Sequence, residues 1–284
     1  MTLFTSPDHA AEALAATGYL ADPATATTVF LADALGKPLL LEGPAGVGKT
    51  ELAKAVSAAT GAELIRLQCY EGLDEARALY EWNYKKQLLR IQAAGDESWD
   101  TTHDDIFTDE FLLERPLLAA IRRENPTVLL IDETDKADVE VEGLLLEVLS
   151  DFQVTIPELG TLTARHRPFV VLTSNAAREL SEALKRRCLY LHLDYPSAER
   201  ERDIVLSRVP GLEAGLAEQL VKVIVTLRAL EIKKPPSIAE TIDWARTLLA
   251  LGLDSLEEGT VRGTLGVVLK HVSDQERAIK ELDL

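Results

Sequence analysis

The sequence predicts an α/β protein, with a parallel sheet sandwiched between helices and then a small all-helical domain. Short apolar runs alternate with helical patterns from about residue 38 to 194, and this alternation is typical of parallel strands joined by crossover helices. A glycine-rich segment, GPAGVGKT, joins the first apolar run to a helix. Beyond residue 195 only helical patterns remain. We therefore expect an α/β domain over 1–195 and a helical domain over 196–284.

The elements of the α/β domain follow in chain order. Helices over 8–17 and 24–35 end at Gly18 and Gly36, because glycine readily leaves the helical conformation. The apolar strand from Pro38 to Leu41 precedes the glycine-rich segment and a helix that begins near Glu51. The remaining elements are a strand at 63–68, a helix at 72–92, a polar loop at 95–105, a helix at 110–124 with an irregularity at Pro116, a strand at 128–131, a helix at 142–150, a hairpin at 153–164 turned near Gly160, and strands at 169–175 and 188–193.

The helical domain begins after a hinge. Pro196 ends the last strand, and Ser197 suits the N-cap of a helix that carries Glu199 and Glu201 in its first turn. Helical patterns then cover 198–208, 217–230, 238–251 and 255–280.

Residues Gly43 to Thr50 form a complete GxxxxGKT phosphate-binding loop between a predicted strand and a predicted helix. Glycines let backbone N–H groups surround phosphate oxygens, and the helix points its positive end at the same group. Lys49 should reach the β- and γ-phosphates, and Thr50 should ligate Mg²⁺. The other interpretation is a glycine-rich turn before an ordinary helix. The expected nucleotide contacts are Gly43, Pro44, Ala45, Gly46, Val47, Gly48, Lys49, Thr50 and Glu51.

Two carboxylates, Asp132 and Glu133, end the apolar strand Val128 to Ile131. Ligands bind at the carboxyl ends of strands in open α/β sheets. Asp132 should hold Mg²⁺, directly or through water, and Glu133 should polarise the attacking water. An acid directly after the metal acid favours nucleotide hydrolysis over transfer to an acceptor. The alternative is a solvated acidic loop, since residues 134–138 are also mostly polar.

Two later features carry further site candidates. Asn175 ends the strand VVLTSN, where its amide could orient water near a γ-phosphate, or it could simply form a turn. Arg186 and Arg187 lie just before the last strand. From there an arginine could reach a neighbouring subunit's γ-phosphate in a ring. A basic, solvated helix end is the other interpretation.

Composition limits the partners and the compartment. The 284 residues carry a formal net charge of −17, which argues against a nucleic-acid surface or an anionic membrane as main partner. Cys69 and Cys188 fit no metal-binding spacing, so we expect a reducing compartment. No apolar run approaches the length of a membrane span, and residues 1–4 lack the features of a signal peptide. We expect a cytoplasmic protein.

Taken in order, these motifs resemble those of the AAA+ ATPases: phosphate loop, acid pair (LLIDE), helix and hairpin, Asn strand (LTSN), arginines (LKRRC) and helical lid. The segments LLEGPAGVGKTELAKA and ALKRRCLYLHLDYP resemble the MoxR branch, and most closely the CoxD-like ATPases linked to carbon monoxide dehydrogenase maturation. The resemblance spans about residues 18–250, and it identifies the hairpin at 153–164 with the pre-sensor-1 insertion.

The resemblance implies a ring, often a hexamer, that acts as a chaperone-like ATPase. It implies ATP and Mg²⁺ as ligands, a von Willebrand factor A partner and a metalloenzyme client. By motif match, Lys49 and Thr50 bind phosphate and Mg²⁺, Asp132 binds Mg²⁺ and Glu133 is the catalytic base. Asn175 matches sensor 1, and Arg187 matches the arginine finger better than Arg186 does. Tyr19 and Leu20 fall where the adenine pocket begins, although core packing would also explain them.

The lid departs from the family pattern. MoxR-type lids carry a sensor-2 arginine at the start of a lid helix, after a Pro-Ser pair. Here that pair is Pro236-Ser237, and Ile238, Ala239 and Glu240 follow it without an arginine. Arg246 comes two turns later.

The predicted function is a Mg²⁺-dependent, ATP-hydrolysing ring motor of MoxR type that remodels a protein client, with a metalloenzyme awaiting its cofactor as the favoured client. One alternative is a nucleic-acid remodeller, against which the negative charge argues. Another is a nucleotide-gated scaffold with little turnover, which the absent sensor-2 arginine would suit.

Overall fold

The computed structural model describes residues 2–95 and 99–283. Their contacts form two compact units. The first unit comprises Met1–Thr17, Ala21–Glu42 and Thr50–His192, and the second comprises Gly18–Leu20, Gly43–Lys49 and Leu193–Leu284. Most of the phosphate loop therefore belongs with the C-terminal helices, while Thr50 belongs with the sheet.

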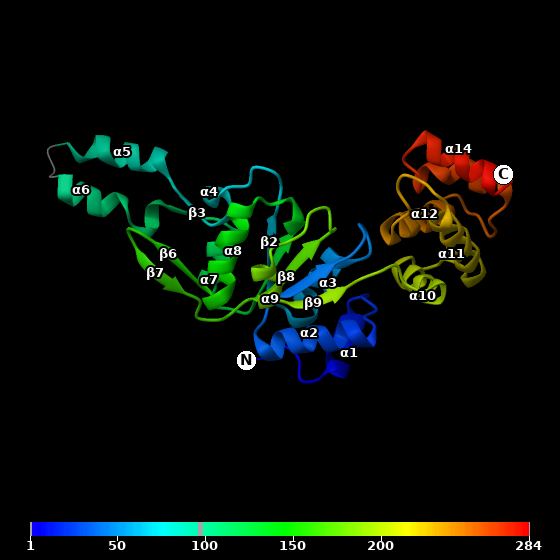
Figure 1. Ribbon diagram of the computed structural model, residues 1–284, viewed down its shortest axis with the longest axis horizontal. Helices are drawn as coiled ribbons and strands as arrows, with labels where there is room; N and C mark the ends of the chain where they lie inside the picture. Colours follow the sequence, from blue (N-terminus) through cyan, green and yellow to red (C-terminus); the bar gives the residue numbers. More distant parts are fainter. Residues whose placement is uncertain (1, 96–98, 284) are drawn as a thin grey trace. The chain divides into compact units, whose positions relative to one another are not determined.

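The first unit is built on a five-stranded sheet of order β2-β5-β8-β1-β9, in which every neighbouring pair is parallel (Figure 1). All residues of β5 and β8 are buried, as expected for inner strands of a parallel sheet covered on both faces. The predicted parallel sheet with flanking helices and a helical C-terminal region is confirmed. The strands are β1 (Leu39–Glu42), β2 (Glu63–Gln68), β5 (Thr127–Asp132), β8 (Phe169–Ser174) and β9 (Leu189–His192).

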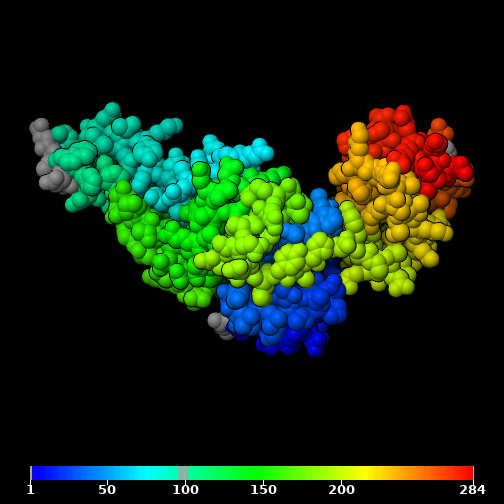
Figure 2. Space-filling view, in the orientation of Figure 1, coloured from blue at the N-terminus to red at the C-terminus, as the bar shows by residue number. Residues whose placement is uncertain are grey.

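Helices flank this sheet and begin at the caps that the sequence supplies. Ser6 and Asp22 each cap a helix whose first residue is proline, which suits that position because its fixed φ is already helical. The two helices pack together on the β1–β9 side of the sheet, at the surface of this unit (Figure 2). The flanking helices are α1 (Pro7–Ala16), α2 (Pro23–Leu35), α3 (Lys49–Thr60), α7 (Pro116–Arg122), α8 (Val139–Asp151) and α9 (Glu182–Arg187).

The helices predicted at 72–92 and 110–124 are present only in part, because a strand interrupts each of them. The first is divided into α4 (Glu75–Ala78), β3 (Tyr80–Trp82) and α5 (Tyr84–Ala94), and the second into η1 (Asp109–Phe111), β4 (Leu112–Glu114) and α7. Strands β3 and β4 pair antiparallel, with Trp82 opposite Leu112. This long-range pairing buries Trp82 and overrides the local helical pattern.

The predicted polar loop at 95–105 is wrong where the structure describes it. Helix α6 (Trp99–Ile106) occupies most of it, and residues 96–98 lie outside the described residues. The helix is polar overall, but Thr102 and Ile106, one turn apart, are buried. Helix α6 packs against α5 (Figure 1).

A hairpin connects α8 to β8. Strands β6 (Gln153–Ile156) and β7 (Gly160–Thr163) pair antiparallel, and Val154 and Ile156 are buried. Gly160 turns the chain with a φ of +81°.

The second unit has a helical core centred on Trp244, which is fully buried and donates from Nε1 to Thr264 at 2.8 Å. Helices occupy most of the predicted helical stretch at 255–280, but they break around Gly263 and Gly266, residues with low helix propensity. Its second half begins anew where buried Asp274 accepts from the backbone of Lys233. The elements are α10 (Ala198–Arg208), α11 (Ala214–Ala229), α12 (Ile238–Ala250), α13 (Glu258–Thr264), η3 (Leu265–Val267) and α14 (Val272–Glu281).

Within the described ranges, no helix is long and apolar enough to cross a bilayer.

Candidate nucleotide site

The phosphate loop needs glycine at two positions. Gly43 has a φ of +153°, and a Cβ there would lie 1.9 Å from the carbonyl oxygen of Leu193. Gly46 has a φ of +76°, and a Cβ there would lie 2.3 Å from the Cβ of Ser237. Any side chain at either position would displace backbone or a helix cap, so the loop conformation depends on these glycines.

Lys49 turns back on its own loop. Its ammonium donates to the carbonyl oxygens of Gly43 at 2.6 Å and Pro44 at 2.8 Å, and the residue is only 6% exposed. These bonds hold a positive charge at the loop, which is where a phosphate group would need it.

The start of helix α12 lies against the same loop. Ser237 caps α12 in a capping box with Glu240, and the N–H of Ile238 donates to the carbonyl oxygen of Gly46 at 3.2 Å. The two adenine-pocket candidates also belong to this unit. Tyr19 lies beside Gly48, and the carbonyl oxygen of Leu20 accepts from Arg200.

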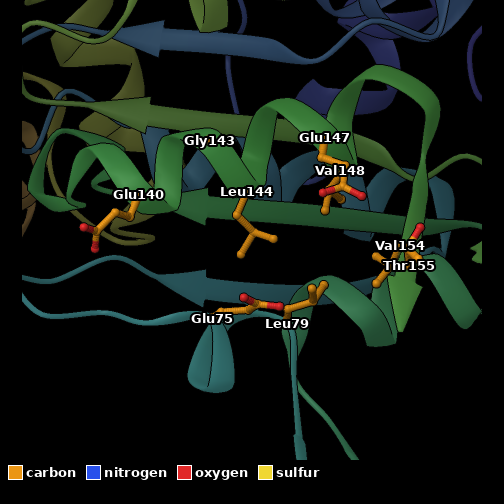
Figure 3. A pocket seen from close by; sticks show the side chains of 9 residues that line it. All are labelled: Glu75, Leu79, Glu140, Gly143, Leu144, Glu147, Val148, Val154 and Thr155. Atoms are coloured by element: carbon orange, nitrogen blue, oxygen red, sulfur yellow. The ribbon is translucent and has the colours of Figure 1, made fainter. Parts of the chain in front are cut away.

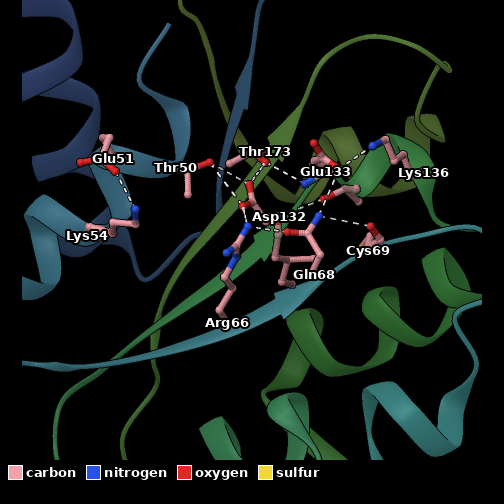
Figure 4. Close-up of polar contacts among 12 residues, drawn as sticks. Thr50, Glu51, Lys54, Arg66, Gln68, Cys69, Asp132, Glu133, Lys136 and Thr173 are labelled. Carbon is pink, nitrogen blue, oxygen red and sulfur yellow. Dashed lines mark hydrogen bonds and ion pairs between the residues drawn. The ribbon is translucent and has the colours of Figure 1, made fainter. Parts of the chain in front are cut away.

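In the first unit, three polar side chains converge on one carboxylate (Figure 4). Asp132, at the end of β5, is 3% exposed. It accepts from the hydroxyls of Thr50 at 3.0 Å and Thr173 at 2.6 Å. Its Oδ2 also pairs with the Arg66 guanidinium at 2.6 Å, and Arg66 is itself bonded to Gln68. The structure thus brings Thr50 and Asp132 together as predicted, and adds Arg66, Gln68 and Thr173.

Glu133 is held from both ends. Its backbone has a left-handed φ of +56°, and its N–H donates to Thr173 Oγ1 at 2.8 Å. Its carboxylate accepts from Gln68 Nε2 at 3.1 Å and from Lys136 Nζ at 2.7 Å. The hydrogen bond to Glu133 raises the pKa of Lys136. A left-handed non-glycine residue is costly, so the turn that aims Glu133 is maintained by its surroundings.

The acid cluster also affects Cys69, the residue after β2. Burial first, and then the charges of Asp132, Asp135 and Glu133, raise the pKa of Cys69 to about 12. Cys69 is therefore a neutral thiol at physiological pH. Burial likewise raises the pKa of Cys188 to about 12, and both cysteines are free thiols.

Asn175 follows β8, the neighbour of β5 in the sheet. Its N–H donates to Asp135 Oδ2 at 3.2 Å, and the same oxygen accepts from Ala177 at 2.9 Å. Asp135, 4% exposed, therefore anchors the turn that carries Asn175. The acid-rich segment after β5 is thus partly structural.

Comparison with known proteins decides the family. Residues 38–188 match the AAA domain (dynein-related subfamily). The chain belongs to this AAA family. An uncharacterized protein of Staphylococcus haemolyticus (strain JCSC1435) is 27% identical over 224 residues, covering 76% of this chain and 77% of its own. Chaperone protein ClpB 2 of Parasynechococcus marenigrum (strain WH8102) is 33% identical over 141 residues, which cover 49% of this chain and 13% of that protein.

Solved structures show the same fold. One mutant of Thermotoga maritima RuvB is 17% identical, with a TM-score of 0.50, covering 99% of this chain and 73% of that one. Another is 19% identical, also with a TM-score of 0.50, covering 94% and 73%.

The AAA-domain residues fit a Mg²⁺–nucleotide ligand. The Thr50 hydroxyl and the Asp132 carboxylate, 3.0 Å apart, are the hard oxygen donors that Mg²⁺ prefers. Across residues 2–95 and 99–283, no group of three or more His, Cys, Asp or Glu could hold a metal by itself. Phosphate oxygens would have to complete the shell, as is usual for Mg²⁺.

The two arginines before β9 differ in their surroundings. Arg187 donates from Nε to Ser150 Oγ at 2.6 Å and from Nη1 to the carbonyl oxygen of Ala183 at 3.0 Å. Arg186 is exposed and has no ion pair with any described residue. Arg187 is thus tethered within its own AAA domain, and Arg186 is not.

The second unit of this AAA protein contains a largely buried arginine that the motifs did not indicate. Arg228 on α11 pairs with fully buried Glu201 at 2.5 and 2.8 Å. Its Nε donates to the carbonyl oxygen of Pro236 at 2.7 Å, and its guanidinium lies 4.2 Å from the Tyr195 ring centroid. It therefore fixes the turn before Ser237. Arg246, by contrast, pairs with Asp243 on the exposed face of α12.

Proposed function

We propose that the chain is a Mg²⁺-dependent ATPase that assembles into a ring and uses hydrolysis to remodel a protein client. The observation that carries this proposal is the acid pair at the end of β5. Asp132 is buried beside the Thr50 hydroxyl, while Glu133 is turned away from it and held by polar side chains. Two adjacent carboxylates in different surroundings suit two different roles, as metal ligand and as base.

The remaining roles follow from the chemistry of each side chain. Lys49 and the loop N–H groups bind phosphate, and Thr50 with Asp132 holds Mg²⁺. Glu133 takes the proton from the attacking water, and Asn175 orients that water. Bound Mg²⁺ would neutralise charge on the phosphate oxygens. Tyr19 and Leu20 contribute to the adenine pocket.

A ring would supply what one subunit lacks. We assign the arginine finger to Arg187, with Arg186 in reserve. An arginine in trans would stabilise charge on a neighbour's γ-phosphate. The tether of Arg187 to Ser150 means that it must release this hydroxyl to act, whereas Arg186, which is also exposed, forms no ion pair with a described residue. A hexamer is the expected stoichiometry.

The client is proposed to be a protein. The sequence motifs favour the MoxR branch and, within it, maturation of a metalloenzyme with a von Willebrand factor A partner. The similarity to a protein named as the chaperone ClpB supports a remodelling role. The net charge of −17 would repel nucleic acid, and two free thiols suit the cytoplasm.

Light scattering combined with phosphate release tests the proposal. Wild-type protein with Mg·ATP should hydrolyse ATP and show a mass several times that of a subunit. Lys49→Ala should do neither. ATP hydrolysis by a strictly monomeric wild-type protein would contradict the proposed ring. Absence of phosphate release from the wild type would contradict the proposed ATPase activity.

A further inference from the structure

A groove of about 250 Å³ lies on the first unit, and none of the proposed nucleotide-site residues lines it (Figure 3). Helix α8 forms one wall of the groove. The other walls come from α4, from Leu79 directly after it, and from β6. The lining residues are Glu75, Leu79, Glu140, Gly143, Leu144, Glu147, Val148, Val154 and Thr155.

The groove has an apolar floor. Leu79, Val148 and Val154 are 5% exposed or less, and Leu144 points from α8 toward Leu79 and Glu75 (Figure 3). Glu140, Gly143, Leu144 and Glu147 share one face of α8, because they are spaced three or four residues apart. A continuous surface of this helix thus faces the groove.

The rim is uniformly negative. Glu75, Glu140 and Glu147 are exposed, and no lysine or arginine lines the groove. None of the three carboxylates forms an ion pair within the described parts of the chain. A rim of one sign around an apolar floor is complementary to a ligand that carries positive charge beside apolar groups.

Gly143 supports a ligand in the groove independently of the charged rim. It lies in the interior of α8, where glycine costs about 0.5–1 kcal/mol relative to alanine. Its φ is not left-handed, and a Cβ there would meet no atom within 4 Å. Neither conformation nor internal packing explains it. The missing side chain leaves the helix backbone open at the groove, so that another chain can approach it closely.

We propose that this groove binds a segment of the protein client that carries lysine or arginine beside a leucine-like side chain. The proposal rests on the proposed client-remodelling function and names the class of peptide that it engages. The apolar side chain would pack on Leu79 and Leu144, with the cation between the glutamates. An acidic peptide or a nucleic acid would be repelled by the same rim.

Fluorescence anisotropy with two labelled synthetic peptides tests the proposal. One peptide alternates leucine and arginine, and the other alternates leucine and glutamate. The full chain, without nucleotide, should bind the arginine peptide and not the glutamate peptide. This binding should weaken as the salt concentration increases. Glu140→Lys and Glu147→Lys should each weaken binding by about fivefold, equivalent to roughly 1 kcal/mol for an exposed ion pair. Glu12→Lys on α1 is the matched control, with the same charge change at an exposed site.

Gly143→Ala separates binding from folding. It should raise the Tm by about 2 °C, because alanine favours the helix. It should nevertheless weaken peptide binding by about fivefold, because a methyl group intrudes on the ligand. Unchanged binding in this variant, or equal loss in Glu12→Lys, overturns the proposal. The proposal is also overturned if Glu147→Lys, without peptide, forms assemblies of a different mass from those of the wild type. That result would assign the groove to a second copy of the chain.

The failure of this proposal is distinguishable from that of the motor. If the wild type turns over ATP but does not discriminate between the peptides, only the proposal for the groove is overturned. Absence of ATP turnover overturns the motor, whatever the peptides show.

Discussion

Arg66 and Asp132 form an ion pair of 2.6 Å between neighbouring parallel strands. The register of β2 and β5 places Gln68 opposite Asp132 and Arg66 opposite Leu130, so Arg66 reaches the carboxylate diagonally. Asp132 is almost fully buried, whereas the Arg66 side chain is 49% exposed. A protein cation therefore occupies the carboxylate that we assign to Mg²⁺.

Arg66→Gln should bind divalent metal more tightly than the wild type. The substitution removes a positive charge and frees Asp132 Oδ2, and for a half-exposed pair we expect about a fivefold lower Kd. Mn²⁺ binding in the presence of ADP, followed by electron paramagnetic resonance, measures this without catalysis. Arg123→Gln is the matched control, because Arg123 pairs with Glu63 at the other end of β2. Equal or weaker Mn²⁺ binding in Arg66→Gln would contradict the assignment of Asp132.

Cys69→Ala should reduce the loss of stability at high pH. Burial raises the pKa of Cys69 from 9.0 to about 12, so the folded state retains a proton that the unfolded state loses. The stability that the protonated Cys69 contributes is complete below pH 9 and is lost as the pH rises from 9 toward 12. The free energy of unfolding, measured in urea from pH 8 to 11, should fall more steeply for the wild type than for Cys69→Ala. Parallel curves would show that Cys69 ionises equally in both states.

Arg228→Ala should destabilise the second unit. It leaves Glu201 buried without its cation, which typically costs about 3–5 kcal/mol. The double variant Arg228→Met with Glu201→Gln should recover much of that loss, because no buried charge remains unpaired. Denaturant unfolding checks both variants. A loss below about 1 kcal/mol in Arg228→Ala would mean that the pair is not the clamp we describe.

Arg187→Ala subunits mixed with Lys49→Ala subunits should recover part of the lost ATPase activity. Some mixed interfaces would pair an intact finger with an intact phosphate loop, and arginine fingers contribute about 10³–10⁵ in rate. Phosphate release from verified hetero-oligomers is the measurement, and Arg186→Ala takes the same test in parallel. Rescue with Arg186→Ala but not with Arg187→Ala would transfer the finger to Arg186.

Motif spacing predicted the proximity of Thr50 and Asp132 better than it predicted the contacts around them. The parallel sheet and the proximity of Thr50 and Asp132 follow from a strand–loop–helix pattern and an acid-ended strand. Arg66 and Gln68 alternate with buried Ile65 and Leu67, so a polar face on β2 was a readable signal. What they contact depends on strand register, which the sequence does not display.

The interruptions of the helices predicted at 72–92 and 110–124 share a cause. Trp82 and Leu112 pair across 30 residues of chain, and that contact converts two helical patterns into strands. Arg228 reads as an ordinary helix-end arginine until the structure places Glu201, Pro236 and Tyr195 around it. Local propensity cannot predict an element that is stabilised by a distant partner.

The central claim is that Glu133 is the base of an ATPase, and Glu133→Gln tests it most directly. Glutamine keeps the shape and the hydrogen bond to Gln68 but cannot take up a proton. In single-turnover experiments with radiolabelled ATP and Mg²⁺, the variant should bind ATP like the wild type and hydrolyse it about 10²–10⁴-fold more slowly. Hydrolysis within about threefold of the wild-type rate, well short of the loss expected for a general base, would contradict the assignment.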